Sequence, residues 1–239
     1  MILFAIVAVP LACYVILHYT GERGPTIGPV VRGALWYAVG FPATIITEAL
    51  LDLQYNASDL LRYFAIRDAY LPYVLGLLGF FLFYHRLAAE DDRAMVPAMT
   101  LFLAAFLTVF GLAQIMLDTG FLGVYRVLIL PAHRVALMIL TPLLVGVWIR
   151  EVRVALRVLY ALLLIVLPFL TAIAPALLAL SQPVPGIAVA VLLTAAAVVV
   201  YLSLRSAYYP DRGLGGGGLS ENTLRSGSRQ SSLADEPGL

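Results

Sequence analysis

The stretch VLILPAHRVALMILTPLLVGVWI, residues 127–149, is long and apolar enough to cross a lipid bilayer as one helix. It nevertheless carries His133 and Arg134 about one third of the way along. An arginine side chain keeps its proton, so in hydrocarbon Arg134 requires a partner, a water-filled cavity or the membrane interface. We therefore expect the rest of the chain to be organised around this charge.

Composition places the whole chain in a membrane. Of its 239 residues, 62% are hydrophobic and 12% are charged, and the mean hydropathy is +0.96. These values lie outside the range of soluble domains. The net charge of +1, without a dense basic run, gives no expectation of a nucleic-acid partner. The partner expected from composition is the lipid bilayer.

The residue types that are missing exclude several chemistries. Cys13 is the only cysteine, which excludes an intrachain disulfide and a cysteine-based zinc site. All fifteen basic residues are arginine. Without lysine there is no Schiff base with retinal or pyridoxal phosphate, and no Walker A phosphate loop. Three histidines on three different stretches lack the spacing of a metal site. We expect neither a cofactor nor a metal.

Seven apolar stretches predict an all-α fold, a polytopic bundle of transmembrane helices. About 20 helical residues span the hydrocarbon. The first stretch lacks the basic segment and the cleavage site of a signal peptide, so it is expected to remain as a span. The second is ambiguous because it contains Glu48 and Asp52. The stretches are residues 1–17, 34–53, 69–84, 95–117, 127–149, 158–180 and 187–204.

The distribution of arginines resolves that ambiguity. If all seven stretches cross, eleven arginines lie on one side of the membrane and three on the other; if the second does not cross, the split is nine to five. The positive-inside rule therefore favours seven spans, with the amino terminus outside and the carboxyl terminus in the cytoplasm. The three outer arginines, expected in loops, are Arg62, Arg67 and Arg126.

Two regions of different composition follow from this interpretation. Residues 1–204 are predicted to form the transmembrane domain. Residues 205–239 are rich in Gly, Ser and Arg and predict a disordered cytoplasmic tail, because they contain too little apolar surface for a core. The expected location is the endoplasmic reticulum or the plasma membrane, while the oligomeric state is left open.

Prolines inside the spans predict kinks. Each removes one helical hydrogen bond, and the carbonyl that this frees must be satisfied by a neighbour or face a cavity. Packing of kinked helices and a bent cavity wall are both compatible with this pattern. The residues are Pro10, Pro42, Pro72, Pro131, Pro142, Pro168 and Pro175.

The predicted topology brings acidic residues to the depth of Arg134. Glu48 lies roughly 7–8 Å below the outer end of its span and Arg134 roughly 10–11 Å below the same surface, from the helical rise per residue. Glu48 is therefore its expected partner. Glu48 and Asp52 share a helix face, and two carboxyls in low dielectric do not both ionise, which leaves one as a proton donor. The alternative is a purely structural pair that holds helices together.

Other polar residues extend the predicted site. Asp68 and Asp118 are expected with Asp52 at the outer ends of three spans. His133 points about 100° away from Arg134 on a helix, so the two face different partners. We assign candidate catalytic roles to Glu48, Asp52 and Arg134, and candidate substrate-binding roles to the other three residues.

These residues favour a membrane-embedded enzyme that applies acid/base chemistry to a lipophilic small molecule, as a biosynthetic cyclase or isomerase does. In size and span count the chain resembles the compact seven-span terpene cyclases of fungal pathways. Those enzymes carry a second acidic residue in the last span, and residues 187–204 contain none. A small-solute or proton-coupled transporter and a non-catalytic receptor or accessory subunit are the alternatives.

Overall fold

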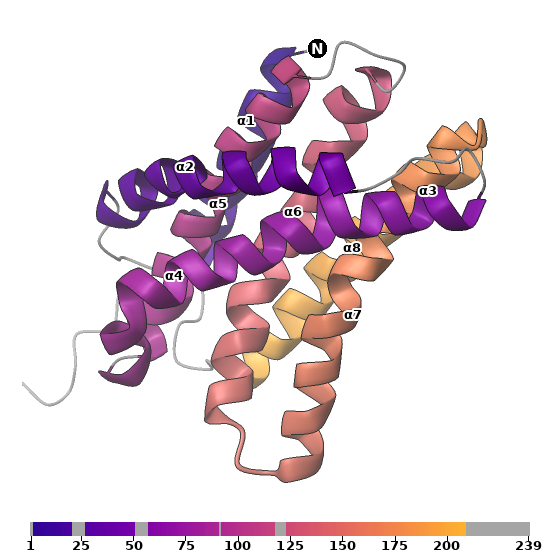
Figure 1. The fold of residues 1–239 in the computed structure, drawn as a ribbon. Coiled ribbons are helices and arrows are strands. Elements are labelled where there is room, and N and C mark those ends of the chain that lie inside the picture. Colours follow the sequence, from indigo (N-terminus) through magenta and orange to yellow (C-terminus); the bar gives the residue numbers. More distant parts are fainter. Residues whose placement is uncertain (1, 21–26, 51–56, 91, 118–122, 209–239) are drawn as a thin grey trace, which may run out of the picture.

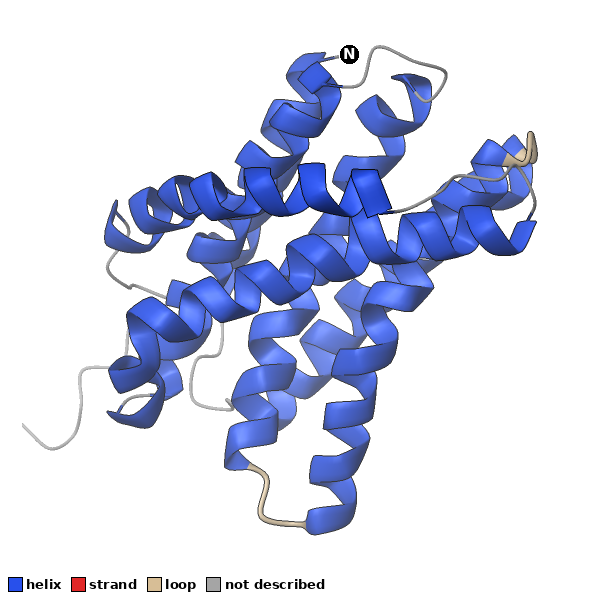
Figure 2. Ribbon diagram, viewed as in Figure 1, coloured by secondary structure: helices blue, strands red, loops and turns tan. Residues whose placement is uncertain are grey.

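All seven apolar stretches lie largely within helices. The computed structural model describes residues 2–20, 27–50, 57–90, 92–117 and 123–208, and the described residues contain no strand (Figure 2). The elements are α1 (Ile2–Thr20), α2 (Ile27–Leu50), α3 (Ala57–Phe64), the π-helical segment η1 (Ala65–Tyr70), α4 (Leu71–Glu90), α5 (Asp92–Leu117), α6 (Gly123–Arg150), α7 (Val154–Ala179) and α8 (Pro183–Tyr208).

Among the described residues, five helical stretches are long and apolar enough to cross a membrane. They are residues 27–47, 58–84, 94–114, 154–179 and 183–207. Residues 7–18 of α1 form a shorter apolar helix. The predicted all-helical class is confirmed at this level, and the helices are those of an integral membrane protein.

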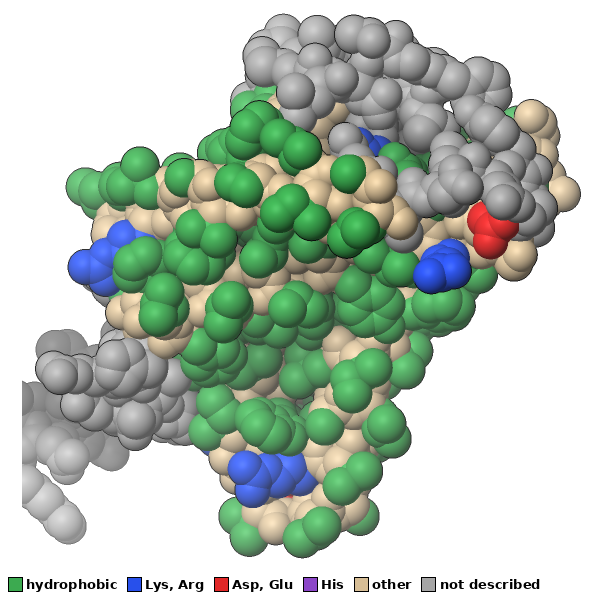
Figure 3. All heavy atoms as spheres, in the orientation of Figure 1, with side chains coloured by type: hydrophobic (Ala, Val, Ile, Leu, Met, Phe, Trp, Pro, Cys, Tyr) green, Lys and Arg blue, Asp and Glu red, His purple; other side chains and the backbone are tan. Residues whose placement is uncertain are grey.

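The surface is apolar where lipid would lie. Leu35 on α2, Leu162 on α7 and Leu192 on α8 are 69%, 53% and 68% exposed. Figure 3 shows hydrophobic side chains over the middle of the molecule, with basic side chains near its left, right and lower edges. Apolar groups outside and charges at the edges are typical of a helix bundle in lipid.

Helices α5 and α6 form the centre of the structure. α5 packs against α1, α2, α4 and α6, while α6 also packs against α1, α7 and α8. In Figure 1, α2 and the continuous rod α3–η1–α4 run across the front of these helices. Phe102, Phe106 and Phe110 are fully buried and lie on one face of α5, because they are four residues apart.

The prediction that Arg62 and Arg67 lie in a loop is wrong. The rod begins at Ala57, twelve residues before the predicted start of that span at residue 69, so Arg62 lies in α3 and Arg67 in η1. Leu60 and Phe64 are buried while Arg62 is exposed, which makes α3 amphipathic and therefore inconspicuous by average hydropathy. Arg67 is only 3% exposed, with its guanidinium carbon 5.3 Å from the centre of the Tyr63 ring.

Two other predicted boundaries also shift. Arg126 lies within helix α6, which begins at Gly123, and not in a loop. Helix α8 continues to Tyr208, so residues 205–208 of the predicted tail are helical. The tail from residue 209 onward lies outside the described residues. In both places a short segment that contains an arginine extends an apolar helix. Packing of the apolar part against other helices stabilises the helix, and the extension follows from it.

Prolines shape two parts of the fold. Pro72 has no N–H to give to the carbonyl of Asp68, and the chain before it widens into η1, where the Leu71 N–H donates to the Ile66 carbonyl. Near Pro168 in α7, the Tyr70 hydroxyl donates to the Ile165 carbonyl at 2.7 Å. This bond joins η1 to α7 at the residue after Leu164, whose carbonyl is the one that Pro168 leaves without its helical donor.

Candidate functional site

Arg134 is buried at the interface of α6 with α5. Its side chain is 2% exposed. Nη2 donates a hydrogen bond to Oε1 of Gln114, and Nη1 donates to the Leu107 carbonyl at 3.2 Å. The guanidinium carbon lies 5.4 Å from the centre of the Phe110 ring. α5 therefore supplies an amide oxygen, a main-chain oxygen and an aromatic face to one buried cation.

Gln114 continues this contact to a third helical segment. Its Nε2 donates to Oδ1 of Asp68 at 3.0 Å. Asp68 is 1% exposed and lies in η1. We call the three residues Asp68, Gln114 and Arg134 the polar chain. The opposite charges at its ends fix the orientation of the amide, with oxygen toward Arg134 and nitrogen toward Asp68.

The sequence of α5 explains why Arg134 fits there. Leu107, Phe110, Gly111 and Gln114 have the spacing of one helix face. A Cβ atom at Gly111 would overlap Nη1 of Arg134. The missing side chain at Gly111 thus provides the space that the guanidinium occupies, one turn from the carbonyl and one turn from the amide that bind it.

η1 places two buried charged residues within the rod. Arg67 and Asp68 are consecutive and both are buried. π-helical turns inside α-helices occur frequently at functional sites, because the widened turn re-aims side chains that a regular helix would send elsewhere. Here it joins the carboxylate of Asp68 to Gln114.

The structure brings together two of the six predicted site residues. Arg134 and Asp68 are joined through Gln114. The contacts described for Arg134 go to α5. Asp68 was predicted at the outer end of a helix. It lies instead inside the continuous rod, because the amphipathic α3 precedes it. Asp52 and Asp118 lie outside the described residues, as do the side chains of Glu48 and His133.

Gln114 was missed by the sequence analysis. It is a lone amide near the end of an apolar stretch, LFLAAFLTVFGLAQIML, residues 101–117. A polar side chain in a membrane helix usually pairs within the bundle, and that signal identifies Gln114. What the sequence does not give is the helix on which its partner lies.

An apolar groove of about 540 Å³ lies between α1, α2 and α5. Such a volume is within the range of small-molecule sites. Pro10, Tyr14, His18 and Val30 are exposed at its walls, so the groove opens on the outer surface of the bundle. Its other lining residues are Cys13, Leu17, Ala34, Pro97, Leu101, Ala104, Ala105, Thr108 and Val109.

The groove and the polar chain use neighbouring faces of α5. Ala105 and Thr108 line the groove, whereas the carbonyl of Leu107 accepts from Arg134. Successive helical residues are 100° apart, so the two faces adjoin. One helix, α5, therefore borders both an apolar space and a buried charge.

Within the part of the chain that the structure describes, no three His, Cys, Asp or Glu side chains lie together as metal ligands. No family model matches this chain, and neither a curated protein nor a solved structure gives a significant match.

Replacement of Gly111 by alanine tests the fit of Arg134. We expect Gly111→Ala to displace the guanidinium and to lower the free energy of unfolding by about 1–3 kcal/mol, as overpacking does. In an Arg134→Leu background the same substitution should cost much less, because the overlapping atom is gone. Unfolding in detergent micelles, monitored by circular dichroism, gives the free energies of unfolding of the wild type, the two single variants and the double variant. An equal cost in both backgrounds would contradict this role for the glycine.

Proposed function

We propose that the chain is a seven-span membrane protein with its amino terminus outside and its carboxyl terminus in the cytoplasm. The connections from α5 to α8 lie on alternating sides of the molecule, which supports this topology for those helices (Figure 1). α5 ends and α6 begins near the top of the view, and α7 ends and α8 begins at the upper right. α6 ends and α7 begins at the bottom, where arginines are concentrated. Alternation of these helix ends, together with the arginines at the end of the α6–α7 hairpin, favours this orientation.

We further propose that the protein is an enzyme that applies acid/base chemistry to a lipophilic small molecule within the membrane. The observation that carries this proposal is that α5 borders both the apolar groove and the polar chain. A polar solute requires a wet, polar cavity, whereas this groove is apolar and opens toward lipid. The space therefore favours a hydrophobic molecule, and the neighbouring helix face supplies charge.

Each residue of the polar chain has a distinct role in this mechanism. Asp68 is the carboxyl group that takes or gives a proton. Arg134 keeps its charge and stabilises negative charge that develops beside it in low dielectric. Gln114 orients both groups. Glu48 and Asp52 are further proposed acids, and His133 and Asp118 proposed substrate contacts, from their positions in the sequence.

Lipid extracts from cells that lack this chain and from complemented cells test the proposal. We expect a lipophilic metabolite that the wild type produces and that Asp68→Asn and Arg134→Gln do not. Ala105→Phe, which fills the groove, should also abolish the product. Ala196→Phe, on the exposed side of α8, is the matched control and should retain it. Folding is checked by circular dichroism. Full activity of both Asp68→Asn and Ala105→Phe would contradict the proposal.

Transport is the second candidate, and η1 is the observation that favours it. Interrupted membrane helices bind substrates and coupling ions in many carriers. η1 places Asp68 and Arg67 at such an interruption. The same extracts distinguish the two functions, because a transporter changes the distribution of a molecule across the membrane and leaves its structure and total amount unchanged.

A further inference from the structure

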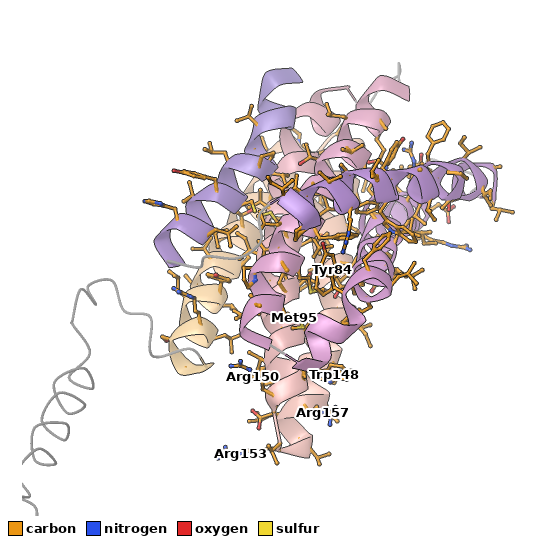
Figure 4. All side chains as sticks on the ribbon, turned by 90° about the vertical axis from the view of Figure 1, so that its left-hand side faces the viewer. Tyr84, Met95, Trp148, Arg150, Arg153 and Arg157 are labelled. Carbon is orange, nitrogen blue, oxygen red and sulfur yellow. The ribbon has the colours of Figure 1, made fainter. Side chains whose placement is uncertain are left out.

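The hairpin between α6 and α7 carries a concentration of positive charge at its end. Arg150 ends α6, Arg153 precedes α7 directly, and Arg157 follows in the first turn of that helix. Figure 4 shows all three near the lower end of the hairpin, with Arg150 and Arg153 to one side and Arg157 below Trp148. Arg153 and Arg157 are exposed. We call residues 148–157 the basic tip.

A single acidic residue lies within the basic tip. The carboxylate of Glu151 accepts the backbone N–H of Arg153 at 3.0 Å, and the Glu151 N–H donates to the Val147 carbonyl at 2.9 Å. Glu151 thus holds the turn between the helices. Three arginines against one carboxylate leave the tip with a net positive charge.

Apolar side chains are exposed between these charges. Val152 is 90% exposed and Val154 is 75% exposed. The guanidinium carbon of Arg157 lies 5.1 Å from the centre of the Trp148 ring. Tryptophan and arginine beside exposed aliphatic groups are typical of the boundary between hydrocarbon and headgroups. In water, both valines would be exposed without apolar contact.

The start of α7 adds to the positive field. Its N-cap position is Arg153, and no side chain caps the first turn. The N–H groups of a helix N-terminus and the helix dipole both favour anions. These groups lie among the arginine side chains, so the tip presents main-chain donors and guanidinium groups on one short segment.

We propose that the basic tip binds the phosphate groups of anionic lipids at one surface of the membrane. Arginines spread around the hairpin end, together with exposed valines, fit a lipid surface better than one face of a protein partner. The inference does not depend on the enzymatic proposal, because it concerns a region remote from the polar chain and requires only insertion of α6 and α7.

Quenching of tryptophan fluorescence by brominated lipids tests this inference. The chain contains two tryptophans, Trp36 and Trp148. The Nε1 group of Trp36 donates to the Leu75 carbonyl at 2.8 Å within the bundle. The difference between the full chain and its Trp148→Phe variant gives the quenching at Trp148. Vesicles contain either brominated phosphatidylglycerol or brominated phosphatidylcholine, each diluted into unbrominated phosphatidylcholine.

In the wild type, we expect Trp148 to be quenched preferentially by the brominated anionic lipid. Each of the substitutions Arg153→Gln and Arg157→Gln should reduce the preference roughly fivefold, from the attraction of one basic residue to an anionic surface. Arg62→Gln is the matched control, since Arg62 is also exposed but lies on α3. Its preference should equal that of the wild type. A thermal melt in detergent verifies that each variant is folded.

Two results would overturn the inference. One is equal quenching of wild-type Trp148 by the anionic and the zwitterionic lipid. The other is loss of the preference on addition of inorganic phosphate but not of sodium chloride at matched ionic strength, which would identify a site for soluble phosphate. Equal weakening by both salts agrees with a lipid surface, because both screen exposed charges.

Discussion

Replacing Gln114 with leucine is expected to lower the free energy of unfolding by about 3–5 kcal/mol, the usual cost of removing one partner from a buried charged contact. Gln114 supplies the oxygen that accepts from Arg134 and the nitrogen that donates to Asp68. Leucine supplies neither. The guanidinium keeps its proton and its charge, so the substitution leaves a permanent, buried cation with fewer acceptors.

The matched substitutions separate the charge from the packing. Arg134→Leu leaves a neutral amide with fewer donors and should cost less, about 1–3 kcal/mol. The double variant Gln114→Leu/Arg134→Leu should be more stable than Gln114→Leu alone, because the buried cation is gone. Unfolding by sodium dodecyl sulfate in mixed micelles measures all three. If the double variant is less stable than Gln114→Leu, the amide does not act by accepting the hydrogen bond of the buried Arg134.

Gly33→Ala is expected to destabilise the contact between α2 and α5 more than any other glycine-to-alanine substitution in α2. A Cβ atom at Gly33 would overlap the carbonyl oxygen of Phe102 and lie 3.1 Å from its carbonyl carbon. These are main-chain atoms of α5, so no rotamer change relieves the overlap and α2 must move away from α5. Small residues permit such close approach of membrane helices. We expect a loss of about 3 kcal/mol, at the upper end for overpacking.

Gly28→Ala provides the control on the same helix. A Cβ atom there would meet the Tyr84 hydroxyl at 3.7 Å, an ordinary van der Waals contact. Gly28 is the second residue of α2, so alanine gains there less than the roughly 1 kcal/mol by which it favours a helix interior over glycine. The control should therefore be neutral or slightly stabilising in thermal melts. Equal destabilisation by the two substitutions would show that α2 and α5 are not in close contact at Gly33.

Hydropathy predicted the helices correctly and failed where a helix is amphipathic. All seven apolar stretches lie largely in helices, and in the described part of the chain five helical stretches are long and apolar enough to span a membrane. The segment 57–68 was predicted outside the membrane because Asp59, Arg62 and Arg67 lower its average hydropathy. Burial of Phe64 and Arg67 against neighbouring helices depends on contacts distant in sequence, and an average over a window contains no such information.

Depth in the bilayer indicated which residues lie at the level of Arg134 and favoured Glu48 as its partner. The side chain of Glu48 lies outside the described residues, so that pairing stays a prediction. Depth does not specify which helix lies beside α6 or which face that helix presents. In the structure α5 lies there, and it presents Gln114, the Leu107 carbonyl and the space at Gly111.

The sequence by itself determined that this chain belongs in lipid, that its secondary structure is helical, and that Arg134 needs an acceptor. Those conclusions follow from composition and from the cost of a charge in hydrocarbon, which depend on the residues and not on their arrangement. Only the tertiary structure decided that the acceptor is an amide on α5 and that Asp68 joins it through a widened turn. Packing of helices remote in sequence sets those contacts, and many arrangements share the same pattern of apolar residues.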